Sequence, residues 1–292
     1  PAWSNSLFED NAEFGYGMLL AQQAIRDGLK AKVEEVAANE NATAEVKAAC
    51  QEWLDTFSVG ATNGVATDKL VAALENVDCP TCKDIVKNKD FLAKKSQWIF
   101  GGFNGVDHVL ASGKDINIMV FNTEVYSNTG GQSSKATPTG AVAQFAAGGK
   151  EVKQKDLAAI AMSYGYVYVA QISMGADMNQ TIKAIAEAEA YPGPSLIIAY
   201  APCINHGIKK GMAKAQTEEK LAVQSGYWNL FRFNPAAEGK KFTASRLQLT
   251  TRSSSRVRFV THPSHLRTRQ ELRSCLLRQS RMLRISTLTL RS

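Results

Sequence analysis

The expected fold depends most on one segment, Ile116-Asn-Ile-Met-Val-Phe121 followed by Asn122-Thr-Glu-Val-Tyr-Ser-Asn-Thr-Gly-Gly-Gln132. Its first part is a short apolar run, which is typical of a strand that is buried on both faces. Its second part is polar and contains a glycine pair, as loops often do. In parallel α/β sheets, ligands bind beyond the carboxyl ends of the strands, where loops supply oxygen atoms and backbone amides. The segment therefore predicts a ligand-binding loop at the end of a buried strand.

The residue types in this loop favour a site for a metal ion and a diphosphate. Mg²⁺ prefers near-octahedral coordination by oxygen. Two phosphate oxygens could supply part of this coordination shell, and the hydroxyl of Thr123, the amide oxygen of Asn128 and a loop carbonyl could supply further ligands. Gly130 and Gly131 would let the backbone approach the phosphates closely. The same residues are also typical of an ordinary turn after a strand, so the pattern alone leaves both interpretations open.

Strand and helix patterns alternate on both sides of the loop. The expected strands are 97–100, 116–121, 166–172 and 195–200, and the expected helices are 156–164, 178–190 and 212–225. Gly165 closes the first of these helices, and Asp177 and Gln180 have the spacing of a capping box at the start of the second. Alternating β and α units predict an α/β fold, a parallel sheet with flanking helices.

Residues 1–95 predict an N-terminal helical layer. One long helix is expected over 11–38, and a second carries a single apolar stripe made of Val46, Cys50, Trp53, Leu54 and Phe57. Residues 58–68 are rich in Gly, Thr and Asn and predict a loop, after which a Lys-rich helical composition returns over 69–95. We therefore expect three regions, namely the helical layer 1–95, an α/β core over 96–235, and an irregular tail over 236–292.

Composition and the ends of the chain restrict the class of protein. The 292 residues with 45% hydrophobic content are enough for a full globular core. The sequence has no apolar run of the about 18 residues that a transmembrane helix needs, and its start lacks the features of a secretory signal. We therefore expect a cytoplasmic protein without a membrane partner, and the start at Pro1 suggests a piece of a longer chain.

The net charge of +7 comes from the C-terminal tail. Residues 1–245 contain 23 Lys or Arg and 26 Asp or Glu, whereas residues 246–292 contain 11 Arg and one acidic residue. A basic tail could bind RNA or an acidic surface, because clustered Arg releases counterions from phosphate. The arginines have no aromatic stacking platform beside them, and the abrupt change in residue usage is typical of a shifted reading frame. A nucleic-acid partner is therefore the less favoured interpretation.

Residues Trp98 to Pro235 resemble the thiamine-diphosphate domain at the C-terminal end of the pyruvate:ferredoxin (flavodoxin) oxidoreductases. The resemblance is carried by Asp107-His-Val-Leu-Ala-Ser-Gly-Lys-Asp115, by residues 122–138, by Tyr191-Pro-Gly-Pro-Ser-Leu-Ile-Ile-Ala-Tyr-Ala-Pro-Cys-Ile-Asn-His-Gly207 and by Gly226-Tyr-Trp228. Residues 1–15 are similar to the segment before the first long helix in the same family, so the resemblance covers roughly residues 1–243.

The resemblance implies part of an enzyme that oxidatively decarboxylates pyruvate with coenzyme A to acetyl-CoA and CO₂. Thr123 and the carbonyl oxygen of Val125 would ligate Mg²⁺, and Asn128 would be catalytic. The residues lining the thiamine diphosphate would be Thr123, Glu124, Val125, Tyr126, Ser127 and Asn128. Electrons would pass to iron–sulfur clusters and then to ferredoxin or flavodoxin, and a homodimer is expected from the family only.

Two cysteine motifs have competing interpretations. Cys203 follows the strand 195–200, where a cysteine is often a small buried hydrophobe, but the resemblance implies a ligand of a [4Fe-4S] cluster whose other thiolates lie upstream of Pro1. Cys79-Pro-Thr-Cys82 could clamp a metal or cycle a disulfide, yet no second pair or supporting His spacing accompanies it, which favours two structural thiols. His206 fits either a polar group in a substrate channel or a hydrogen-bonded turn residue.

The sequence departs from the family between Gly102 and Phe103. The family has a Gly-Asp-Gly sequence and an aromatic, acidic turn there, and about eight residues are missing. That Asp would be the main carboxylate on Mg²⁺, and Asp107 is not an obvious substitute. The glutamate that activates the cofactor and the coenzyme A site belong to other domains of the family, so we expect the chain to be inactive by itself. The alternatives are a non-catalytic fragment that binds through its basic tail and an oxidoreductase of another 2-oxo acid.

Overall fold

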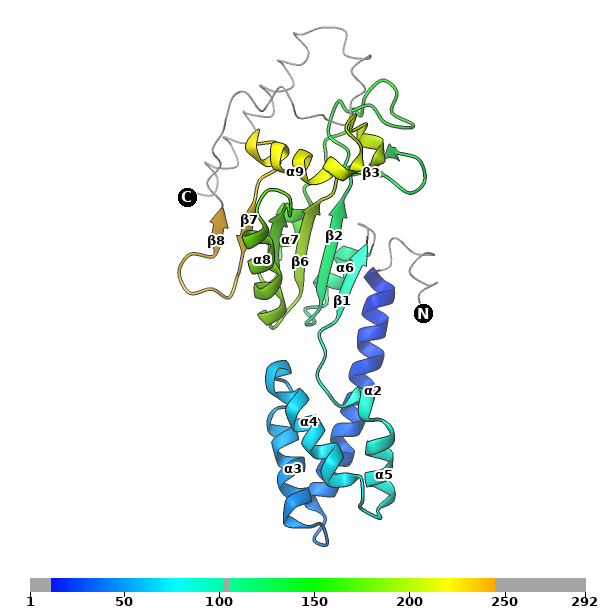
Figure 1. Cartoon of the computed structure of the whole chain (residues 1–292), viewed down its shortest axis with the longest axis vertical. Helices are drawn as coiled ribbons and strands as arrows, with labels where there is room; N and C mark the ends of the chain where they lie inside the picture. Colours follow the sequence, from blue (N-terminus) through cyan, green and yellow to red (C-terminus); the bar gives the residue numbers. More distant parts are fainter. Residues whose placement is uncertain (1–11, 102–104, 245–292) are drawn as a thin grey trace. The chain divides into compact units, whose positions relative to one another are not determined.

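The computed structural model describes residues 12–101 and 105–244 (Figure 1). The predicted gap after Gly102 and the tail from Ser245 onward lie outside the described residues. The chain divides into two compact units. The first comprises residues up to Met119 together with Ala188–Ser195, and the second comprises Val120–Glu187 together with the residues from Leu196 onward.

The sheet has six strands in the order β1-β2-β6-β5-β7-β8. Their bounds are β1 Trp98–Gly101, β2 Asn117–Asn122, β5 Tyr168–Ile172, β6 Ser195–Tyr200, β7 Phe231–Phe233 and β8 Phe242–Ala244. The sheet is mostly parallel, and β7 pairs antiparallel with both β5 and β8. Every residue of β6 and all but one of β2 are buried, as expected for strands that helices cover on both faces. The predicted α/β fold with a mostly parallel sheet is confirmed.

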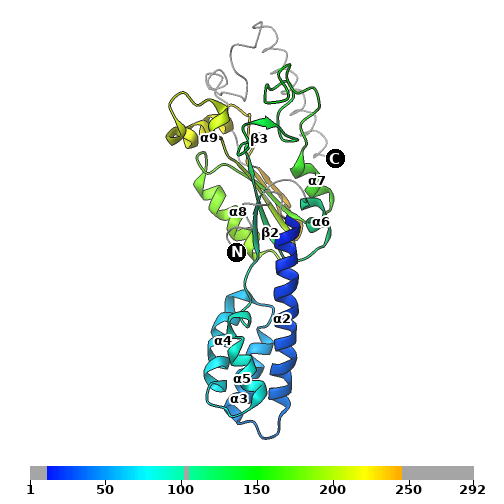
Figure 2. The same cartoon turned by 90° about the vertical axis from the view of Figure 1, so that its right-hand side faces the viewer.

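In the described part of the chain, four α-helices connect these strands, namely α6 (Val106–Ala111), α7 (Leu157–Ser163), α8 (Met178–Ala190) and α9 (Ala215–Gln224). Two of them, α7 and α8, match the predicted helices 156–164 and 178–190 closely. Asp156 caps α7 by accepting the amide of Ala159 at 2.9 Å, and Asp177 caps α8 by accepting the amide of Gln180 at 2.9 Å. Figure 2 shows α7 and α8 on opposite sides of the strands. The predicted helix 212–225 is a short 3₁₀ turn, η3 (Met212–Lys214), that leads into α9.

The helical part of the first unit consists of α2 (Ala12–Ala38), α3 (Ala44–Asp55), α4 (Gly60–Leu74), α5 (Pro80–Lys87) and the 3₁₀ turn η1 (Lys89–Phe91). Helices α3, α4 and α5 lie beside the C-terminal half of α2 in both views (Figures 1 and 2). The predicted apolar stripe forms their core, because Val46, Cys50 and Trp53 are buried and Leu54 and Phe57 pack against them. None of the described helices combines the length and apolarity that a membrane span requires.

The prediction of a loop over 58–68 is wrong, because most of these residues belong to helix α4. Its polar residues hydrogen-bond within the helix bundle. The side-chain oxygen of Asn63 accepts from Arg26 at 2.8 Å and from the amide of Lys94 at 2.7 Å. The hydroxyl of Thr67 accepts from the indole of Trp53 at 3.1 Å. Tertiary hydrogen bonds thus override the low helix propensity of Gly, Thr and Asn.

Strands β7 and β8 were not predicted. They pair with each other, and β7 pairs with β5, in antiparallel registers. Strand β8 lies beyond residue 235, where we expected the α/β core to end. The sheet therefore extends past residue 235. The predicted domain boundaries at residues 95 and 235 stay a prediction.

Candidate functional site

The predicted ligand loop follows directly from β2 and folds back on itself. Its turn begins at Glu124, which has a left-handed backbone (φ +62°) and whose amide donates to the side chain of Asn122 at 3.0 Å. Two short strands, β3 (Val125–Tyr126) and β4 (Gln132–Ser133), then pair antiparallel. Gly131 closes the turn between them by donating its amide to the carbonyl of Tyr126 at 2.8 Å. The loop is therefore held by its own backbone rather than being an open connection.

The two predicted Mg²⁺ ligands lie next to each other in this loop. The hydroxyl of Thr123 donates to the carbonyl oxygen of Val125 at 2.8 Å. Mg²⁺ binds oxygen at about 2.0–2.1 Å in an octahedron, so two neighbouring ligands are about 3 Å apart. The separation of the two oxygen atoms matches one edge of such an octahedron. A metal there would replace the hydrogen bond, and the Thr123 proton would turn toward another acceptor.

Glu124, between these two residues, is turned inward. Its side chain is almost completely buried, and its Oε2 lies 3.1 Å from Nε2 of His206. The hydroxyl of Tyr227 donates to Oε1 of the same carboxylate. The hydroxyls of Ser134 and Thr137 both donate to the backbone carbonyl of Glu124. Glu124 was predicted to line the cofactor, but its carboxylate is already bound by protein donors. What its side chain contributes to the loop is a rigid anchor.

Cys203 lies on the turn that follows β6, directly beside the loop. The ends of β2 and β6 are joined by a hydrogen bond of 3.1 Å from the amide of Ala201 to the carbonyl of Asn122. Cys203 is buried against Val125. Gly131 has a left-handed backbone (φ +88°), which residues other than glycine rarely adopt, and an added Cβ would also come within 2.9 Å of the Asn205 side chain. The predicted metal loop and the predicted cluster ligand are thus neighbours at one end of the sheet.

The sequence offered two interpretations of His206, and the structure favours the hydrogen-bonded turn residue. It is buried at the end of the 3₁₀ turn η2 (Ile204–His206), and its Nδ1 accepts the amide of Cys203 at 3.0 Å. While Nδ1 accepts this bond, the ring carries its proton on Nε2, where it faces Glu124. The imidazole therefore bridges the Cys203 turn and the buried carboxylate.

The surroundings of Cys203 and His206 shift the pKa values of both groups. Burial raises the pKa of Cys203, but the hydrogen bonds from His206 and Ser127 outweigh it and lower the pKa to about 7. Burial lowers the pKa of His206, but its hydrogen bonds with Cys203 and Glu124 outweigh it and raise the pKa to about 9. The second proton of the ring would break the bond from the Cys203 amide to Nδ1. A thiolate, the form that binds iron, is accessible to Cys203 near neutral pH.

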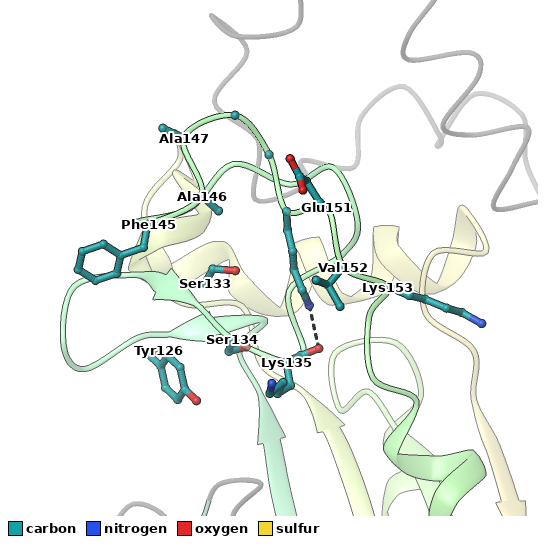
Figure 3. A pocket seen from close by; sticks show the side chains of 13 residues that line it. Tyr126, Ser133, Ser134, Lys135, Phe145, Ala146, Ala147, Glu151, Val152 and Lys153 are labelled. Atoms are coloured by element: carbon teal, nitrogen blue, oxygen red, sulfur yellow. Dashed lines mark hydrogen bonds between the residues drawn. The ribbon is translucent and has the colours of Figure 1, made fainter.

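The remaining predicted loop residues are more open. Asn128 is exposed at the tip, Ser127 is half-buried, and Tyr126 is 44% exposed. Tyr126 lines a cavity of about 560 Å³ (Figure 3), together with residues 133–135 and 145–153. The ammonium group of Lys150 donates to the carbonyl of Lys135 at 3.0 Å across this cavity. Thr123, Val125 and Asn128 do not line it, so the cavity adjoins the predicted metal ligands without containing them.

The described residues supply only part of each predicted metal site. Thr123 and Val125 offer two neutral oxygen ligands, and the family's carboxylate would belong beside Gly102, outside the described residues. Cys203 offers a single thiolate. Among the described residues, no three His, Cys, Asp or Glu side chains group closely enough to hold a metal ion. The donor set therefore fits Mg²⁺ and an iron–sulfur cluster in kind, but further ligands would have to come from elsewhere.

Sequence reasoning missed the link between Glu124, His206 and Tyr227. His206 and Tyr227 lie 82 and 103 positions after Glu124 in the sequence, so no local spacing connects them. The one available signal was the acidic residue inside an otherwise neutral metal loop, which we took for a residue lining the cofactor. The structure shows the Glu124 carboxylate as a buried acceptor, and its place in the lining of the cofactor stays a prediction.

Comparisons with known proteins agree with this geometry. Residues 98–199, which include β1, β2, the loop and nearly all of β6, match the family described as thiamine pyrophosphate enzyme, C-terminal TPP binding domain. Over 252 residues the chain is 53% identical to the pyruvate-flavodoxin oxidoreductase of Klebsiella pneumoniae. The chain is thus similar to the pyruvate:flavodoxin and pyruvate:ferredoxin oxidoreductases. The resemblance identified from the sequence is confirmed.

The similarity covers most of this chain but a small part of each relative. The Klebsiella alignment covers 82% of the chain and 21% of that protein. The pyruvate:ferredoxin oxidoreductase of Moorella thermoacetica is 53% identical, with 82% and 22% covered. The mitochondrial pyruvate dehydrogenase [NADP(+)] of Euglena gracilis is 46% identical, with 82% and 14% covered. The chain thus spans about a fifth of the length of the oxidoreductases it matches.

One solved structure, a 2-oxoglutarate:ferredoxin oxidoreductase from Magnetococcus marinus with 2-oxoglutarate, coenzyme A and succinyl-CoA bound, aligns at 15% identity and a TM-score of 0.34. That alignment covers 74% of this chain and 73% of the other. Similarity at this level is too low for details of the site to be transferred.

Proposed function

We propose that this chain is the thiamine-diphosphate-binding part of a pyruvate:ferredoxin or pyruvate:flavodoxin oxidoreductase. The observation that carries the proposal is the 2.8 Å approach of the Thr123 hydroxyl to the Val125 carbonyl at the end of a buried parallel strand. It supplies two adjacent oxygen ligands of the kind that a Mg²⁺–diphosphate complex takes. The match of residues 98–199 to a thiamine pyrophosphate-binding domain supports the same cofactor.

The residues of this chain would bind and orient the cofactor, while thiamine diphosphate, when bound, supplies the carbanion chemistry that decarboxylates a 2-oxo acid. Thr123 and Val125 would hold Mg²⁺ and, through it, the diphosphate. The exposed Asn128, at the loop tip, would reach the reacting part of the cofactor. The bonds that Glu124 receives from His206 and Tyr227 would keep the loop in this shape before the cofactor arrives.

Cys203 would contribute one thiolate to a [4Fe-4S] cluster beside the cofactor. Its contact with Val125 means that an iron atom on its sulfur would lie close to the loop that binds the cofactor. Such proximity suits transfer of single electrons from the cofactor to the cluster. The other thiolates would come from parts of the longer protein that this chain does not span.

The substrates and partners belong to the proposal for the whole enzyme. Pyruvate and coenzyme A would be the substrates, and ferredoxin or flavodoxin the electron acceptor. The relatives' names include flavodoxin, ferredoxin and NADP(+), so similarity alone does not choose the acceptor. A homodimer and the cytoplasmic location expected from the sequence remain predictions.

The test is turnover by the full-length oxidoreductase that carries this section, with the missing Gly-Asp-Gly segment restored after Gly102. Oxidation of pyruvate with coenzyme A is compared with that of longer 2-oxo acids, with ferredoxin or flavodoxin as acceptor. Thr123→Ala is expected to reduce turnover by about tenfold or more, because losing a contact that supports a bound metal typically costs about that much. Thr243→Ala removes the same hydroxyl at an exposed position of β8 and should leave turnover unchanged.

Two results would lead to other conclusions. Faster oxidation of a different 2-oxo acid would retain the cofactor and change the substrate. A restored enzyme without any thiamine-dependent turnover would contradict the proposal and favour the non-catalytic fragment considered from the sequence.

A further inference from the structure

The motif Cys79-Pro-Thr-Cys82 lies at the start of helix α5 in the first unit. Cys79 is the N-cap residue, Pro80 is at the first helical position, and Cys82 is in the first turn. The sulfur of Cys79 accepts the backbone amide of Cys82 at 3.4 Å. The interaction with Cys82 lowers the pKa of Cys79. The helix start therefore brings the two cysteines into a single turn, with the Cys79 sulfur on the backbone amide of Cys82.

The two thiols have different surroundings. Cys82 is buried in the helical core with Trp53 and Ile85, whereas Cys79 is partly exposed. Its hydrogen bonds with Cys82 lower the pKa of Cys79, and burial raises the pKa of Cys82 to about 12. An accessible thiol that ionises more easily beside a buried, protonated thiol is the arrangement in which one cysteine attacks and the other resolves.

A metal site explains this pair less well. Among the described residues, the further thiol that affects this pair is Cys50, which is fully buried on α3. No His, Asp or Glu side chain among the described residues completes a metal-binding group with these cysteines. Two thiols alone leave a tetrahedral zinc ion short of two ligands.

We propose that Cys79 and Cys82 are a redox-active dithiol that exchanges with low-molecular-weight disulfides. The thiolate of Cys79 attacks one sulfur of the disulfide, the disulfide bond breaks, and the first thiolate leaves and takes up a proton. Cys82 then loses its proton and attacks the sulfur of Cys79, which releases the second thiolate. The protein dithiol is oxidised by two electrons to an intramolecular disulfide, and the small disulfide is reduced to two thiols. This reaction is independent of the thiamine-dependent function proposed above.

The test uses the complete 292-residue chain and glutathione. The reduced, folded chain is equilibrated with mixtures of oxidised and reduced glutathione, free thiols are alkylated, and tryptic peptides are weighed by mass spectrometry. Cleavage after Lys69 and Lys83 releases one peptide that contains both Cys79 and Cys82 but no other cysteine. We expect complete loss of alkylation in this peptide, with a mass two hydrogens lower, at a glutathione ratio that leaves Cys50 reduced.

Two variants separate exchange from simple helix capping. In Cys82→Ser the reaction should stop at a mixed disulfide between Cys79 and glutathione, because the resolving thiol is gone. In Cys79→Ser the buried Cys82 should stay reduced in the folded protein. Circular dichroism verifies that each variant is folded, and the measurement on the unaltered chain decides the question even if one of them is not.

Three results would overturn the proposal. One is a stable glutathione adduct on Cys79 in the unaltered chain. Another is a peptide that stays fully alkylated under the most oxidising mixture. The third is a disulfide that forms only after the chain has been unfolded in urea.

Discussion

Replacement of Glu124 by alanine should destabilise the second unit and loosen the predicted cofactor loop. The substitution removes the carboxylate that accepts from the buried Nε2–H of His206 and from the hydroxyl of Tyr227. A buried donor that loses its acceptor costs about 1–3 kcal/mol, and Tyr227 is only half-buried. We therefore expect a loss of about 2–4 kcal/mol in unfolding free energy. Glu124→Gln keeps one acceptor oxygen in the same shape and should lose about half as much.

The assay is hydrogen exchange in native conditions, read peptide by peptide. Exchange should accelerate in residues 123–137 and in the Cys203 turn, which Glu124 joins, and stay unchanged in the helices of the first unit. Glu238→Ala, which removes an exposed carboxylate, is the matched control and should change stability by about 0.5 kcal/mol or less. If Glu124→Ala behaved like this control, the buried carboxylate would not be an anchor of the loop.

The other predictions test the packing and electrostatics of single contacts. Thr67→Val keeps the shape but leaves the buried indole N–H of Trp53 without its acceptor, and urea denaturation should show a loss of about 1–3 kcal/mol. Gly175→Ala places a Cβ only 2.3 Å from the backbone oxygen of Gln216, and the resulting shift of α9 should cost about 1–3 kcal/mol by the same assay. Burial raises the pKa of Glu219 above its ordinary 4.5, so its ionisation opposes folding. We compare the unfolding free energy of the unaltered chain with that of Glu219→Gln. The unaltered chain should be most stable, relative to this variant, below pH 4.5 and should lose that stability as the pH rises through the raised pKa. A difference in unfolding free energy that stays constant from pH 4 to 8 would contradict this prediction.

The strands and capped helices of the α/β core could be predicted because their signals are local. Apolar runs of strand length became β2 and β6, and the aspartates at 156 and 177 cap the helices they precede. The helix over 60–74 could not be predicted from composition, because Asn63 and Thr67 are stabilised by partners from other helices. Strands β7 and β8 have only three residues each and lack a distinguishing period.

The candidate site divides in the same way. The loop, with Thr123 and Val125 as neighbouring oxygen ligands, could be located because it follows a strand and contains turn residues. The contact between Val125 and Cys203 follows from the topology, since the ends of β2 and β6 meet at one edge of the sheet. The inward turn of Glu124 could not be foreseen, because its partners are distant in sequence and only the folded chain brings them together.

The central claim is that Thr123 and Val125 hold Mg²⁺ and the diphosphate of thiamine diphosphate. The most direct measurement is calorimetric titration of the chain with thiamine diphosphate, with and without Mg²⁺, after the Gly-Asp-Gly segment has been restored following Gly102. We predict binding that requires Mg²⁺ and that weakens at least about tenfold in Thr123→Ala but not in Thr243→Ala. Binding of equal strength without Mg²⁺, or an unchanged affinity in Thr123→Ala, would contradict the claim.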